Sequence, residues 1–149
     1  MASANAIKLK SLKQPAEESD GLRILIARFR PRYLRKEDEN WHVWFKELAP
    51  SKSLWKEYLK DKKIDWDEYS RRYKREILNN PLALRALHNL ASLDRTNNLV
   101  NNQLKLQKPA SQYPDILSNY DTATLLCHCK DESHCHRFLV KQMVKEIHD

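Results

Sequence analysis

The sequence predicts an α/β fold, in which a small, largely parallel sheet is wrapped by several helices within a single domain of residues 1–149. Two short apolar segments, 22–27 and 122–129, have the composition of buried strands. Amphipathic helical patterns separate them, and another follows the second segment. Strands that alternate with helices are typical of α/β domains, and a length of 149 residues suits one domain.

The first two strands are expected near the start of the chain. Residues 7–12 alternate apolar and basic side chains, which is the pattern of a half-buried edge strand. Pro15 and Gly21 mark the turn that follows. The segment LRILIA at 22–27 then predicts a buried strand that stops before Pro31.

Four helices are expected in the middle of the chain. The first ends at Pro50, and its apolar residues recur at helical spacing: Trp41, Trp44, Phe45 and Leu48. Ser51 or Ser53 can cap the second helix, and Asp65 can cap the third. The fourth begins at Asn80–Pro81, since proline suits the first helical position. The apolar faces of these helices are interpreted as core.

The last third of the chain contains one long polar segment and two regular elements. Residues 95–121 are rich in Asn and Gln and predict a polar loop excursion. The segment TATLLCHC at 122–129 predicts a second buried strand. Asp131 or Ser133 can cap a final helix that runs through His148. Its expected inner face consists of Phe138, Leu139, Val140, Met143, Val144 and Ile147.

The two apolar strands predict where a ligand binds. If they are parallel, their carboxyl ends meet at one edge of the sheet, where open α/β sheets usually bind ligands. We therefore expect a basic pocket for a small anion or phosphate at this edge. Its anion-binding residues would be Arg28, Arg30, Arg32 and Arg137. His134 or His136 would transfer protons if the ligand is turned over.

Cysteine and histidine are concentrated in residues 127–137, which hold all three cysteines and three of the six histidines. A zinc ion is one alternative function for this cluster, with Cys127, Cys129, Cys135 and His134 (or His136) as ligands. The spacing differs from that of common zinc motifs. A nucleophilic thiol assisted by a neighbouring histidine is another alternative, and a buried cysteine without chemistry is a third.

The positive charge lies in the first half of the chain. The net charge of +7 belongs to residues 1–75, which carry 19 basic and 12 acidic side chains, whereas residues 76–149 carry 8 of each. Together with Phe29, Tyr33, Trp41 and Trp44, this charge makes a nucleic-acid-binding module a further alternative. No helix-turn-helix, zinc-finger or RNP pattern is recognisable.

The composition excludes several classes of function. With Gly21 as its one glycine, the chain cannot form a dinucleotide fingerprint, a Walker phosphate loop or a hydrolase elbow. No apolar run approaches the ~20 residues that span a bilayer, so no membrane partner is expected. Three cysteines and the lack of an export signal indicate a cytoplasmic protein. The residues identify no cofactor and no oligomeric state.

Several blocks in fixed order resemble the YeaO-like branch of the domain-of-unknown-function family 488. They include PAEESDGLRILIARFRPR at 15–32 and TLLCHCKDESHCH at 124–136, and the resemblance covers roughly 7–94 and 122–148. It implies one small α/β domain with a short parallel sheet, and no established activity. The positions that match the family motif are Arg28, Pro31, Arg32, Trp44, Glu47, Asp131, Glu132, His134 and His136. The chain departs from the motif at Tyr33, where the family has glycine.

Overall fold

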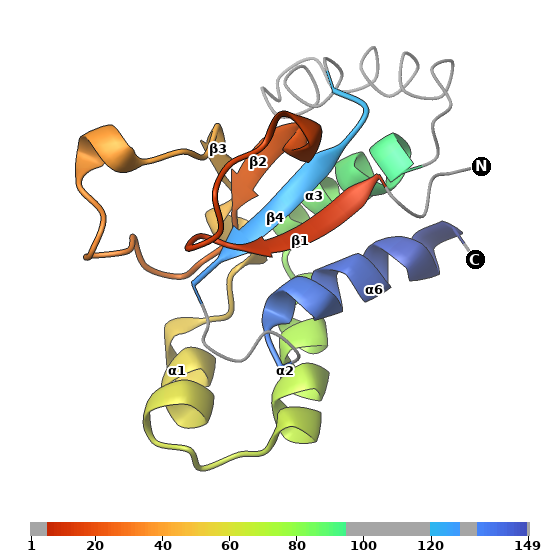
Figure 1. The fold of residues 1–149 in the computed structure, drawn as a ribbon. Helices are drawn as coiled ribbons and strands as arrows, with labels where there is room; N and C mark the ends of the chain where they lie inside the picture. Colours follow the sequence, from red (N-terminus) through yellow and green to blue (C-terminus); the bar gives the residue numbers. More distant parts are fainter. Residues whose placement is uncertain (1–5, 95–119, 129–133, 149) are drawn as a thin grey trace.

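The structure, a computed structural model, describes residues 6–94, 120–128 and 134–148. It confirms the predicted α/β class, because a four-stranded sheet is packed against helices and every pairing between its strands is parallel (Figure 1). The predicted loop excursion at 95–121 lies outside the described residues up to position 119.

The sheet has the order β1-β4-β2-β3. Its strands are β1 (Ile7–Ser11), β2 (Leu22–Leu25), β3 (Val43–Trp44) and β4 (Ala123–Cys127). The strands expected at 7–12, 22–27 and 122–129 are therefore present, each slightly shorter than predicted. All five residues of β4 are buried, because this strand lies between β1 and β2. Burial on both faces explains its continuous apolar sequence.

The helices begin close to the capping residues that the sequence indicates. They are α1 (Lys52–Trp55), which continues as a π-helical turn at Lys56–Lys60, α2 (Trp66–Leu78), α3 (Pro81–Asp94) and α6 (His136–His148). The Ser51 hydroxyl accepts a hydrogen bond from the Leu54 N–H at 3.1 Å, so Ser51 is the cap of α1. The Asp65 carboxylate accepts one from the Glu68 N–H at 2.8 Å.

The helix predicted from Trp41 to Leu48 is wrong. Residues Val43–Trp44 form β3, and a short 3₁₀ turn follows at Lys46–Leu48. The pairing with β2 outweighs the helical spacing, because the His42 N–H donates to the Arg23 carbonyl and the Phe45 N–H to the Leu25 carbonyl. Extended backbone also lets the Trp44 indole N–H donate to the Ala27 carbonyl at 2.8 Å.

One face of the sheet forms the main core with the helices. Its residues pack against side chains from α2, α3 and α6, including Tyr73, Ile77, Leu87, Leu90, Val140 and Val144. The inner face expected for α6 is confirmed except at Phe138, which is 40% exposed. The other face carries a smaller apolar cluster, which Trp41 and Trp44 cover.

A buried ion cluster on this second face joins three strands. Asp20, which precedes β2, is fully buried, and its carboxylate lies 3.1 Å from Lys10 Nζ of β1 and also contacts the Arg23 guanidinium of β2. The Thr124 hydroxyl of β4 donates to the Asp20 carbonyl at 2.7 Å. Burial alone raises the pKa of Asp20. The hydrogen bonds from Glu17 N–H and Lys10, with the charges of Lys10 and Arg23, nevertheless hold that pKa below its ordinary 3.8.

We expect Asp20→Asn to lower the free energy of unfolding by about 3–5 kcal/mol, because Lys10 and Arg23 would stay buried without their counter-charge. Urea denaturation at neutral pH measures the loss. The exposed neighbour Glu18→Gln is the control and should stay within about 0.5 kcal/mol of the wild type.

The same carboxylate makes the stability depend on pH. Since the pKa of Asp20 is lowered by folding, its contribution is present above the ordinary pKa of 3.8 and is lost as the pH falls through the folded value. The difference between wild type and Asp20→Asn should therefore shrink in acid. An unchanged difference at low pH would contradict the ion cluster.

Gly21 stands where no other residue fits. Its φ is +65°, and a Cβ atom would lie 2.1 Å from the Thr122 carbonyl oxygen, which accepts the Leu22 N–H. We expect Gly21→Ala to lower the free energy of unfolding by more than about 1–3 kcal/mol, since backbone strain and the clash act together. The midpoint of urea unfolding reports this cost, and a midpoint equal to the wild type would refute it.

Candidate functional site

The carboxyl ends of β2 and β4 open into a cavity of about 230 Å³. The chain leaving β2 supplies Ala27, Arg28 and Phe29, and the end of β4 supplies Cys127 and His128. Trp55 at the end of α1, Tyr69 of α2 and His136 at the start of α6 line the cavity as well. Figure 1 shows α1 and α2 side by side below this end of the sheet. This is where open α/β sheets usually bind ligands.

His136 is held in one orientation within this cavity. Its side chain is buried, and Nε2 lies 2.7 Å from the Ile26 carbonyl oxygen. A carbonyl only accepts, so Nε2 carries a proton, and in the neutral imidazole Nδ1 then has a lone pair. Nδ1 lies 3.7 Å from the Cys135 Sγ. The imidazole thus presents an acceptor nitrogen to sulfur.

Three residues with metal-ligand chemistry meet here. The side-chain ligand atoms of Cys127, Cys135 and His136 all lie within 4.8 Å of one another, and all three residues are buried. Of the zinc ligands predicted from the sequence, Cys127 and Cys135 are thus brought together. His134 lies elsewhere, with its ring 5.0 Å from that of Trp66, and Cys129 is outside the described residues.

The predicted anion-binding arginines fall into three different environments. Arg28 and Arg32 are exposed, and neither forms a hydrogen bond or ion pair within the described residues. Arg30 is paired with Glu39, so its charge is already neutralised. Arg137 is only 1% exposed, and its Nε and Nη2 meet no hydrogen-bond partner in the part of the chain described. A buried guanidinium is costly unless an acceptor meets it.

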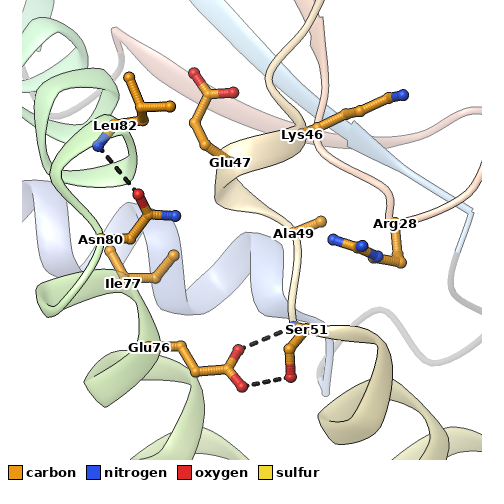
Figure 2. Close-up of a pocket in the computed structure, with 9 residues that line it drawn as sticks. All are labelled: Arg28, Lys46, Glu47, Ala49, Ser51, Glu76, Ile77, Asn80 and Leu82. Carbon is orange, nitrogen blue, oxygen red and sulfur yellow. Dashed lines mark hydrogen bonds between the residues drawn. The ribbon is translucent and has the colours of Figure 1, made fainter.

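A second cavity, of about 560 Å³, adjoins the first through Arg28 (Figure 2). In this view the Arg28 guanidinium is directed towards Ala49, at the end of the short Lys46–Leu48 turn. On the far side, the Glu76 carboxylate accepts hydrogen bonds from the Ser51 N–H, at 2.9 Å, and the Ser51 hydroxyl. Lys46 Nζ lies 4.4 Å from the centre of the Trp44 ring. Within the described residues the Arg28 guanidinium has no hydrogen-bond or ion-pair partner, so it is available to a ligand in this cavity.

Glu47 lines the second cavity and has an unusual pKa. Burial raises the pKa of this carboxyl above its ordinary 4.5, only partly offset by a backbone hydrogen bond. Carboxyls with raised pKa values in cavities are candidates for proton transfer. Glu47 was not among the site residues predicted from the sequence, although it matches the family motif. The pKa of Glu47 is raised because the residue is partly buried. A single sequence does not show which residues of a turn are buried.

Aromatic rings form an apolar wall beside the first cavity. The Phe29 and Trp55 rings meet edge to face at 5.0 Å, and Tyr58 stacks on Tyr69 at 4.3 Å. Phe29, Trp55 and His128 also line a shallower hollow that continues outwards to Arg30 and Arg32. The two hollows form one surface, with aromatic rings between the buried histidine and the exposed arginines.

A family model described as "Active DUF488-N3 subclade" matches residues 7–101 and 101–148 of the sequence. The chain belongs to the DUF488-N3a family. The resemblance to the YeaO-like branch is confirmed as well, because uncharacterized protein YeaO of Escherichia coli (strain K12) is 37% identical over 71 residues, 48% of this chain and 61% of YeaO.

Another relative is uncharacterized protein Rv3073c of Mycobacterium tuberculosis (strain ATCC 25618 / H37Rv), which is 31% identical over 77 residues. This match covers 52% of the chain and 64% of the relative, so the chain spans less than two thirds of these curated relatives. No solved structure matches the sequence. Within the described residues, no helix is both long and apolar enough to cross a membrane.

We expect Glu47→Gln to stabilise the protein slightly at neutral pH. Because folding raises the pKa of Glu47, the charged carboxylate opposes folding above its ordinary pKa of 4.5 and the neutral acid does not. The gain should be about 0.5 kcal/mol at pH 7 and should vanish at about pH 4. Thermal unfolding at both pH values measures it, and a loss of stability at pH 7 would contradict the raised pKa.

Proposed function

We propose that the chain binds a small anionic ligand at the carboxyl edge of its sheet, acting in the cytoplasm as its cysteine usage favours. The position of Arg28 carries this proposal. Its guanidinium lines both adjoining cavities, and no described residue pairs with it. A guanidinium with its donors unused binds a phosphate or carboxylate in a bidentate manner.

The surroundings of Arg28 favour a ligand that is planar as well as anionic. Phe29, Trp55 and Tyr69 offer ring faces or edges to the first cavity, and aromatic rings bind flat apolar groups by stacking. Arg137 is not among the residues that line these two cavities, but its buried Nε and Nη2 meet no acceptor within the described residues, so it is a separate candidate for an anion. A phosphate or carboxylate attached to a flat ring fits both requirements.

A role in proton transfer belongs with His136 rather than with His134. His136 lines the first cavity, whereas the His134 ring lies against Trp66 of α2. Glu47, which lines the other cavity, is a second candidate. Turnover of the ligand would depend on His136 and Glu47, whereas its binding depends on Arg28.

The alternative function, a nucleic-acid-binding module that uses the basic first half of the chain, has one observation in its favour. Phe29 and Tyr33 are 38% and 53% exposed, close in sequence to Arg30 and Arg32, and exposed rings beside cations suit base stacking. The Trp44 side chain is instead engaged in the fold through Ala27 and Lys46. Part of the stacking surface expected from the sequence is therefore unavailable.

The Arg28→Gln variant tests the anion site. We expect inorganic phosphate and a nucleoside monophosphate to raise the melting temperature of the wild type. Their Kd values, measured by calorimetry, should weaken roughly 10- to 100-fold in the variant, since a hydrogen bond to a charged group contributes about 1.5–3 kcal/mol.

The matched control is Arg85→Gln, which removes the same charge from an exposed position on α3. It should bind like the wild type. If both variants bound the anions equally weakly, the loss of affinity would be a general effect of net charge, and the proposed role of Arg28 would be wrong. Tight, strongly salt-dependent binding of an oligonucleotide, with no response to either small anion, would favour the nucleic-acid alternative.

A further inference from the structure

We infer that Cys127, Cys135 and His136 bind a zinc ion through two thiolates and one imidazole nitrogen. Cys127 comes from the end of the central strand β4, Cys135 from the residue before α6, and His136 from the first residue of that helix. The three ligand atoms lie within 4.8 Å of one another in the interior. This inference uses neither Arg28 nor Arg137, but it takes His136 as a ligand, so in the zinc-bound protein Glu47 is the remaining candidate for proton transfer.

The spacing of the ligand atoms suits tetrahedral zinc. With Zn–N of about 2.0 Å and Zn–S of about 2.3 Å, a nitrogen and a sulfur ligand lie about 3.5 Å apart, and two sulfurs about 3.8 Å. The distance between His136 Nδ1 and Cys135 Sγ is 3.7 Å. One ion can therefore lie between these two atoms without rearrangement of the helix start.

The hydrogen bond to Ile26 prepares the histidine for a metal. Histidine ligands characteristically donate their second ring N–H to a carbonyl or carboxylate, which fixes the tautomer and the direction of the lone pair. The contact between His136 Nε2 and the Ile26 carbonyl, at 2.7 Å, supplies this arrangement. It also ties the ligand to the chain leaving β2.

The charge of the site also favours zinc. Two thiolates and a neutral imidazole balance the two positive charges of the ion, and a neutral assembly is tolerated in an apolar interior. Cys127 and Cys135 belong to a small apolar cluster with Leu25, Ala27 and Leu126. Soft sulfur ligands select zinc over magnesium or calcium in such surroundings.

A site of this kind would be accessible to a ligand. Cys127 and His136 line the cavity at the sheet edge. Three protein ligands with one further position are the pattern of catalytic zinc, in which the remaining position holds water or substrate. We therefore place that position on the cavity side, where zinc would favour ionisation of a bound water.

Cobalt substitution of the reduced, full-length chain tests the site directly. We expect one Co²⁺ per chain, with a sulfur-to-cobalt charge-transfer band and the visible bands of a tetrahedral ion, both displaced by Zn²⁺. X-ray absorption of the zinc-loaded wild type should show two sulfurs with nitrogen or oxygen completing the shell. Absence of the charge-transfer band, or a third sulfur, would overturn this ligand set.

The two neighbouring histidines provide a matched pair of variants. His136→Gln should weaken Zn²⁺ binding more than roughly 100-fold, as expected when a ligand is lost, while His134→Gln should bind like the wild type. Cys127→Ser and Cys135→Ser should each lower the charge-transfer intensity. Circular dichroism checks that each variant is folded, and the wild-type spectra decide the question where one is not. Equal binding by His136→Gln and the wild type would refute the inference.

The proposals of a metal site and of an anion site can be refuted separately. Zinc binding that is normal in Arg28→Gln, together with weak phosphate binding, would separate the two. A protein that binds phosphate through Arg28 but gives no cobalt spectrum would retain the proposed function and lose the zinc site.

Discussion

The fold depends on one buried carboxylate. Asp20 contacts Lys10 of β1 and Arg23 of β2 and accepts the Thr124 hydroxyl of β4 on its carbonyl, so one residue joins three strands that are distant in the sequence. The strand register places Lys8, Thr124 and Arg23 side by side on the same face. The buried charges of Lys10 and Arg23 would be costly in the interior without the Asp20 carboxylate.

This arrangement separates the ion cluster that stabilises the sheet from the candidate site. The ion cluster covers one face and leaves the main apolar core to the other face. The cavities, the thiols and Arg28 gather beyond the last residues of β2 and β4. The bond from His136 to the Ile26 carbonyl connects the final helix to this edge, so the geometry of the site follows from the position of β2.

The sequence predicts those features of the fold that depend on residues close together in the chain, such as the helix caps. Ser51 and Asp65 cap their helices because a short polar side chain at that position satisfies the first free N–H groups. β3 could not be predicted, since only its pairing with β2 makes residues 43–44 extended. The choice of His136 over His134 as a partner of the cysteines depends on where α6 begins. The raised pKa of Glu47 depends on burial, which has no local signature.

The strand order has a consequence for synthesis of the chain. β1 and β2 both pair with β4, which begins at residue 123, and not with each other. A nascent chain that lacks β4 therefore has no sheet partner for β1, and β2 can pair only with the two residues of β3. Contacts of such long sequence separation form slowly, and incomplete chains of this type are prone to aggregation. The sheet can therefore be completed only after residues 123–127, in the last fifth of the sequence, have been synthesised.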